Sequence, residues 1–136
     1  MQEFGVAEAR PLVMIAPGGG VNPGAVDVSK RWPVDHFARV ADALVGSYRA
    51  AVILVGLPSD VSSIAALHRS MRFDAVDLAG QTSFGQLAAL IQDSDLFLGN
   101  DSASAQLAAC VDTSSVTIFT TTEPWIYGAK APHARW

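Results

Sequence analysis

A glycine-rich loop with two basic residues is the first part of this sequence whose residue types could do chemistry. Gly18, Gly19 and Gly20 follow a short apolar run, and Lys30 and Arg31 lie later in the same loop. Glycines let backbone N–H groups approach an anion closely, and cations beside a helix start add positive charge. The loop alone supports two interpretations equally well: a phosphate site, or a surface turn with a solvated basic pair.

This loop does not match either of two standard phosphate motifs. Gly19 and Gly24 have the spacing of a P-loop, but Ala25 and Val26 stand where Lys and Ser/Thr are required. Pro23 stands where the third glycine of a G-x-G-x-x-G motif belongs, and no acidic residue ends the second apolar run. A P-loop and a classical NAD site are therefore not expected.

A second polar loop, residues 99–104, precedes a segment with helical character. Asp101 or Ser102 can cap that helix through a side-chain oxygen. The same arrangement would aim free N–H groups of Ser102, Ala103 and Ser104 at a phosphate, with help from the helix dipole. Both interpretations stay open, and the charge of Asp101 opposes an anion unless this carboxylate is paired or binds hydroxyl groups.

Short apolar runs that alternate with helical patterns must position these loops. Runs that are apolar throughout are typical of strands covered on both faces. The predicted strands are 11–16, 51–55, 75–78, 95–98 and 115–119. The predicted helices are 34–45, 61–71, 84–91 and 103–111, and Ser83 with Gln86 forms a capping box before the third of them.

This alternation predicts an α/β fold, a Rossmann-like three-layer open parallel sheet of about five strands in the order 3-2-1-4-5. We expect one domain over residues 1–136, with an irregular tail over 120–136. In such a sheet, ligands bind beyond the carboxyl ends of the strands where the strand order reverses. The loops at that point, which follow the first and fourth strands, are the two loops described above.

Composition excludes several classes of protein. Nine Lys+Arg against thirteen Asp+Glu give a net charge of −4, the wrong sign for a generic nucleic-acid binder. No apolar run is long enough to span a membrane, so a cytoplasmic protein is expected. The single cysteine, Cys110, cannot form an internal disulfide and is expected to be buried, and no metal site or cofactor is expected.

Beyond these patterns, the chain resembles the C-terminal half of glycosyltransferase family 9, the ADP-heptose:lipopolysaccharide heptosyltransferase family. The motifs that carry this resemblance are residues 17–20, 30–33, 55–60, 78–83, 99–102 and 122–124. Their order and spacing agree with the family from about residue 12 to residue 125.

The resemblance implies one half of a GT-B architecture, the half that binds the nucleotide sugar. It places Lys30 at the donor diphosphate, Asp60 near the ribose and Thr82 beside the adenine. The donor-binding residues that it implies are Gly18, Gly19, Gly20, Lys30, Asp60, Thr82, Asp101, Ser102, Ala103 and Gln106. No catalytic residue is expected in this chain, because the family keeps its catalytic carboxylate in an N-terminal acceptor domain that we expect to be absent here.

The sequence also departs from the family pattern. Ala103 stands where the family has Gly, Gln106 stands where it has His, and Thr120 and Thr121 replace a Gly-Pro pair. Two functions therefore remain open. The first is a domain for an ADP-heptose-like nucleotide sugar, bound weakly or no longer bound, which is not active alone and works as a homodimer or with a separate acceptor-domain chain. The alternative is a degenerate, non-catalytic Rossmann-like module that acts through self-association or partner binding.

Overall fold

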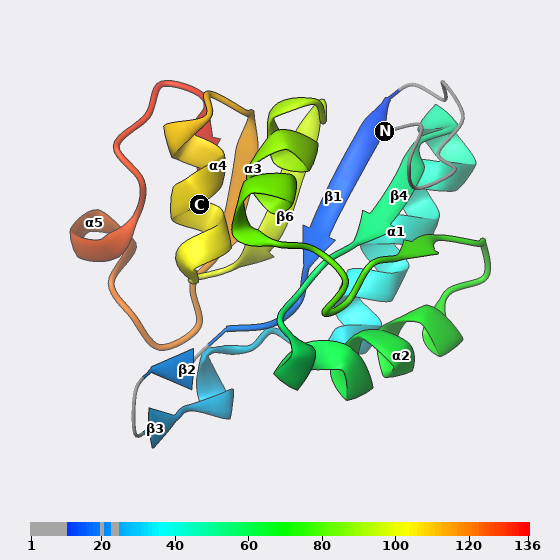
Figure 1. The fold of residues 1–136 in the computed structure, drawn as a ribbon, viewed down its shortest axis with the longest axis horizontal. Helices are drawn as coiled ribbons and strands as arrows, with labels where there is room; N and C mark the ends of the chain where they lie inside the picture. Colours follow the sequence, from blue (N-terminus) through cyan, green and yellow to red (C-terminus); the bar gives the residue numbers. More distant parts are fainter. Residues whose placement is uncertain (1–10, 20, 23–24) are drawn as a thin grey trace.

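The computed structural model describes residues 11–19, 21–22 and 25–136, and its centre is a parallel sheet of six strands. The strands are ordered β5-β4-β1-β6-β7-β8 (Figure 1). They are β1 (Leu12–Ala16), β4 (Ala51–Leu54), β5 (Val76–Asp77), β6 (Leu96–Asn100), β7 (Ser115–Ile118) and β8 (Ala134–Arg135).

The first five of these strands, in chain order, lie as the sequence predicts. The first strand, β1, lies in the middle of the sheet. The strands β4 and β5 follow outward on one side of β1, and β6 and β7 follow on its other side. Met14 of β1 lies between Ile53 and Phe97 in the register of its two neighbours. The strand order therefore reverses between β1 and β6, so the loops after these strands meet at the same edge.

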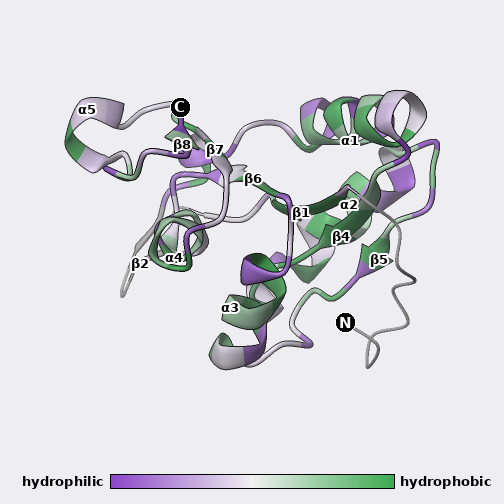
Figure 2. Cartoon of the chain, turned by 90° about the horizontal axis from the view of Figure 1, so that it is seen from above, coloured by the Kyte–Doolittle hydropathy of each residue, from purple (hydrophilic) through white to green (hydrophobic). Residues whose placement is uncertain are grey.

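Helices cover both faces of the sheet, which confirms the three-layer arrangement (Figure 2). On one face, α1 (Val34–Tyr48) and α2 (Val61–Ser70) pack through residues such as Phe37 and Leu67. On the other face, α3 (Phe84–Gln92) and α4 (Ala103–Cys110) pack through residues that include Ile91 and Ala108. All five residues of β1 are buried between these layers, as expected for a central parallel strand.

Residues 120–136 differ from the irregular segment that the sequence predicts. They contain a short helix, α5 (Pro124–Tyr127), and the edge strand β8, in which Ala134 pairs with Ser115 of β7. The loop after β1 also has structure, since β2 (Val21–Asn22) and β3 (Ala25–Val26) pair as an antiparallel hairpin. The 3₁₀ turn η2 (Val28–Lys30) follows this hairpin.

The prediction that Cys110 is buried is wrong, because its thiol is exposed at the end of α4. Ala108 faces the sheet, and each helical residue turns by about 100°, so Cys110 lies on nearly the opposite side of the helix. Within the residues that the structure describes, no helix is long and apolar enough to cross a membrane.

Candidate functional site

A pocket of about 650 Å³ opens at the carboxyl ends of β1, β4 and β6. Nine of the ten residues that the sequence assigns to a donor site line this pocket, and the tenth, Gly20, lies outside the described residues. The nine are Gly18, Gly19, Lys30, Asp60, Thr82, Asp101, Ser102, Ala103 and Gln106. The fold thus brings together loops that are far apart in the sequence.

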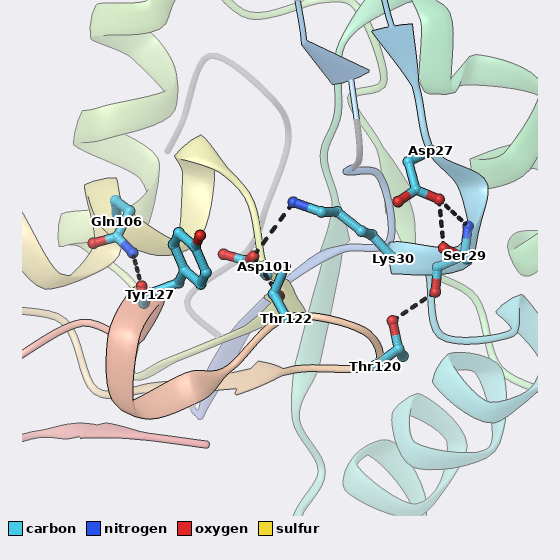
Figure 3. Close-up of polar contacts among 8 residues, drawn as sticks. All are labelled: Asp27, Ser29, Lys30, Asp101, Gln106, Thr120, Thr122 and Tyr127. Carbon is cyan, nitrogen blue, oxygen red and sulfur yellow. Dashed lines mark hydrogen bonds and ion pairs between the residues drawn. The ribbon is translucent and has the colours of Figure 1, made fainter.

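Lys30 supplies a cation to the pocket from the end of η2. Its Nζ lies 3.8 Å from Oδ2 of Asp101, and the two side chains are 23% and 15% exposed (Figure 3). Asp27 caps the turn, because its carboxylate accepts hydrogen bonds from the hydroxyl and the backbone N–H of Ser29. The side-chain bond and then the backbone bond from Ser29 lower the pKa of Asp27 below its ordinary value of 3.8.

The start of α4 forms the opposite wall and carries uncapped N–H groups. Ser102 occupies the N-cap position with an extended backbone, yet no side chain caps the helix. Asp101, the other possible cap, instead accepts a hydrogen bond of 2.8 Å from Thr122 and faces Lys30. The Oγ of Ser102 is buried and has no hydrogen-bond partner among the described residues. Ala103 and Ser104 therefore present backbone donors that no part of the helix satisfies.

Asp60 is the buried carboxylate of the site, with an exposure of only 3%. It ends the 3₁₀ turn η3 (Pro58–Asp60), where its Oδ2 accepts a hydrogen bond of 2.9 Å from the Leu57 N–H. Its Oδ1 lies 3.7 Å from Nη2 of Arg31 and has no hydrogen bond. A Cβ on Gly18 would lie 2.5 Å from Oδ2, so only glycine lets these two loops approach.

Arg31 and Asn100 connect the loops of the pocket, a role that the sequence did not predict for either residue. Arg31 donates a hydrogen bond of 2.9 Å from Nε to the carbonyl of Gly19, which has a φ of 138° that L side chains rarely adopt. Asn100 is fully buried, donates to the carbonyl of Pro17 at 2.8 Å and accepts from the Trp32 N–H at 3.0 Å. An amide side chain at the end of an apolar strand was the only sequence signal for this role.

One wall of the pocket is apolar and comes from the end of β4 and the start of α3. Leu57 and Phe84 lie on this wall with 57% and 71% of their surface exposed. The predicted capping box fixes the start of α3, since Ser83 and Gln86 exchange hydrogen bonds of 2.9 and 3.3 Å. Thr82 lies next to this cap. The pocket therefore combines a charged region with a surface suited to a flat or apolar group.

Gln106 lines the pocket but is already engaged. Its side-chain amide donates a hydrogen bond of 2.8 Å to the carbonyl of Tyr127, at the end of α5 (Figure 3). This bond connects α4 to the segment after β7. Among the residues that the structure describes, no three His, Cys, Asp or Glu side chains gather closely enough to hold a metal ion.

Known proteins have sequences similar to this one. The profile of glycosyltransferase family 9 (heptosyltransferase) matches residues 4–135. Lipopolysaccharide heptosyltransferase 3 of Escherichia coli K12 is 34% identical over 113 residues, which are 77% of this chain and 33% of that protein. Lipopolysaccharide heptosyltransferase 2 of Salmonella typhimurium is 30% identical over 127 residues, 90% of this chain and 34% of that protein.

Solved structures agree with these relatives. The structure of E. coli ADP-heptose lps heptosyltransferase II matches 98% of this chain and 40% of its own, with a TM-score of 0.88 and 25% identity. A glycosyltransferase of family 9 from Veillonella parvula matches 98% of this chain and 36% of its own, with a TM-score of 0.84 and 25% identity. The chain spans about a third of the length of the curated relatives. The chain belongs to glycosyltransferase family 9.

Proposed function

We propose that this pocket binds the nucleotide-sugar donor of a heptosyltransferase-like glycosyltransferase, a donor of the ADP-heptose type. The observation that carries the proposal is the position of Lys30 opposite the uncapped start of α4, in a pocket where loops from β1, β4 and β6 meet. The Escherichia coli protein whose structure matches with a TM-score of 0.88 is named an ADP-heptose lps heptosyltransferase. This name suggests the chemical class of the donor.

The pocket offers a complementary group to each part of such a molecule. Lys30 and the N–H groups of Ala103 and Ser104 would bind the diphosphate, because a cation and a helix N-terminus both stabilise negative charge. Oδ1 of Asp60, which has no hydrogen bond and lies 3.7 Å from Arg31, would accept a hydrogen bond from a ribose hydroxyl. The apolar wall beside Thr82 would hold the base.

Charge sets a limit on how strongly this pocket attracts a diphosphate. Lys30 and Arg31 supply two positive charges, and each lies within 4 Å of a carboxylate, Asp101 and Asp60. Binding would therefore depend on the backbone donors of α4 and on precise placement of Lys30 rather than on a strong positive field. This balance fits a donor that is bound weakly.

We propose that residues 1–136 are one donor-binding domain and that this chain does not transfer sugar by itself. Sugar transfer needs donor and acceptor oriented in the same cleft. The described pocket is lined by residues that the sequence predicts for a donor site, and the chain covers about a third of the relatives' length. An acceptor-binding unit outside these residues would complete the reaction, and a separate acceptor-domain chain or a homodimer partner is a candidate for it. A cytoplasmic location belongs to the same proposal, and cell fractionation tests it.

Isothermal calorimetry of the 136-residue chain tests this function. ADP and an ADP-sugar should bind, and comparison with UDP and a UDP-sugar identifies the base. Lys30→Ala should weaken ADP binding by about 1–3 kcal/mol, the usual value of a charge-assisted contact. Lys130→Ala is the matched control, because Lys130 does not line the pocket and instead donates to the carbonyl of Trp125. Absence of heat with every ligand at millimolar concentration, from folded protein, would reject the proposal.

A second function is favoured by the surface of α5. Trp125, Ile126 and Tyr127 are 67%, 61% and 55% exposed, although they are three consecutive large side chains on a short helix. A degenerate module that associates through this surface would explain their exposure. Light scattering together with the calorimetry above separates the two functions. A stable oligomer without nucleotide affinity favours the second function, and a monomer that binds ADP contradicts it.

A further inference from the structure

The segment that follows β7 contacts both members of the Lys30–Asp101 pair. Thr120 Oγ1 donates a hydrogen bond of 2.6 Å to the carbonyl of Ser29, the residue before Lys30 (Figure 3). Thr122 Oγ1 donates a hydrogen bond of 2.8 Å to Oδ2 of Asp101, the oxygen that faces Lys30. We call Thr120 and Thr122 together the threonine clamp.

Apart from the Asp27 cap, the turn that carries Lys30 has few stabilising contacts of its own. It has three residues, none of them buried, and its backbone bonds are those from Lys30 to Asp27 at 3.3 Å and from Arg31 to Val28 at 3.0 Å. Short 3₁₀ turns with exposed hydrogen bonds open easily. A tertiary hydrogen bond from Thr120 would therefore reduce the opening of this turn and keep the cation in place.

Thr122 acts on the other member of the pair. The carboxylate of Asp101 is 15% exposed, and its Oδ2 meets both the Thr122 hydroxyl and the Lys30 ammonium group. The bond from Thr122 fixes Oδ2 on the Lys30 side, and this leaves the N–H groups at Ala103 and Ser104 uncapped. The two threonines thus connect the segment after β7 to the turn that carries Lys30 and to the carboxylate that faces it.

We infer that Thr120 and Thr122 are positioning residues that preorganise Lys30 and Asp101 for a phosphorylated ligand. This inference rests on the proposed function for its ligand, and it extends that function to a segment that does not line the pocket. Preorganised groups bind more tightly because their ordering is complete before the ligand arrives. Loss of the Thr120 hydrogen bond should weaken ADP binding about 3- to 10-fold.

The first test measures the clamp without a ligand. Amide hydrogen exchange on the full chain should show that Thr120→Val speeds exchange of the Lys30 and Arg31 N–H groups about 3-fold or more. Thr121→Val is the matched control, because Thr121 is exposed and makes no side-chain hydrogen bond with the described residues. The variant Thr120→Ser keeps the hydroxyl group, so its Lys30 and Arg31 N–H groups should exchange as slowly as those of the parent protein. Exchange in Thr120→Val equal to that of the parent protein overturns the inference.

The second test separates positioning of Lys30 from a general structural role. Calorimetry with ADP should show the loss of about 3- to 10-fold in Thr120→Val only when Lys30 is present, and no further loss in the Lys30→Ala background. An equal loss in both backgrounds overturns the inference. A parent protein that does not bind ADP rejects the proposed function instead, and hydrogen exchange alone then decides whether the clamp exists.

Discussion

Substitution of Gly18 by alanine tests the closest contact between the pocket loops. The new Cβ would lie 2.5 Å from Oδ2, 2.6 Å from Cγ and 2.7 Å from Oδ1 of Asp60. An ordinary contact begins at 3.4 Å, so the carboxylate must retreat by about 0.9 Å. It is 3% exposed and bonded to the Leu57 N–H, and therefore has little room to move.

The expected cost follows from these contacts. Overpacking of a buried site costs about 1–3 kcal/mol, and a buried N–H that loses its partner at Leu57 costs about 1–3 kcal/mol. The loss of chain entropy on replacing glycine in the unfolded state returns up to about 1 kcal/mol. Gly18→Ala should therefore lower the free energy of unfolding by about 1–6 kcal/mol.

Urea unfolding followed by tryptophan fluorescence measures this effect. Gly85→Ala is the matched control, since nothing lies within 4 Å of a Cβ at this exposed position of α3. It should stabilise the protein by about 0.5–1 kcal/mol. In an Asp60→Ala background, the cost of Gly18→Ala should fall below about 1 kcal/mol. An unchanged free energy of unfolding in Gly18→Ala, or an equal cost in both backgrounds, would show that the contact with Asp60 does not limit this position.

Three further predictions concern other local features. Asn100→Ala should lower the free energy of unfolding by about 2–4 kcal/mol, because it leaves the Trp32 N–H and the Pro17 carbonyl unpaired; urea midpoints that do not change contradict this. Ser83→Ala should cost about 1 kcal/mol through loss of the α3 cap, measured in the same way, and a smaller cost than about 0.3 kcal/mol counts against it. The pKa of Asp27 is lower in the folded protein than in the unfolded chain. Its contribution to the stability of η2 is therefore present above pH 3.8 and is lost as the pH falls through the folded pKa. An NMR titration of the Ser29 N–H measures this pKa, and a midpoint at or above 3.8 contradicts the prediction.

The central strands were predictable because burial on both faces leaves a plain signal in the sequence. Short apolar runs separated by helical patterns permit few topologies, and the order of β1, β4, β5, β6 and β7 follows from them. The edge strand β8 has only two residues, which is too short for a periodic pattern to reveal it. The burial of Cys110 could not be predicted correctly because α4 is rich in small residues and its buried face has no clear pattern.

The site was predictable in its residues more than in its connections. The glycines, Lys30 and Asp101 could be located because parallel strands bring their following loops to one edge. The roles of Arg31 and Asn100 could not, since each depends on contacts between segments that are distant in the sequence. The sequence suggests Arg31 as a cation for a ligand, and the structure shows it bonded to the glycine turn.

An NMR titration with ADP tests most directly whether this pocket is a nucleotide site. Backbone amide shifts should change in a saturable way at the glycine turn, Gly18 and Gly19, and at Lys30, Ala103 and Ser104 on the facing walls. Changes confined to those walls support the account. No change at millimolar ADP, or changes that gather on β8 and leave these walls unaffected, would contradict it.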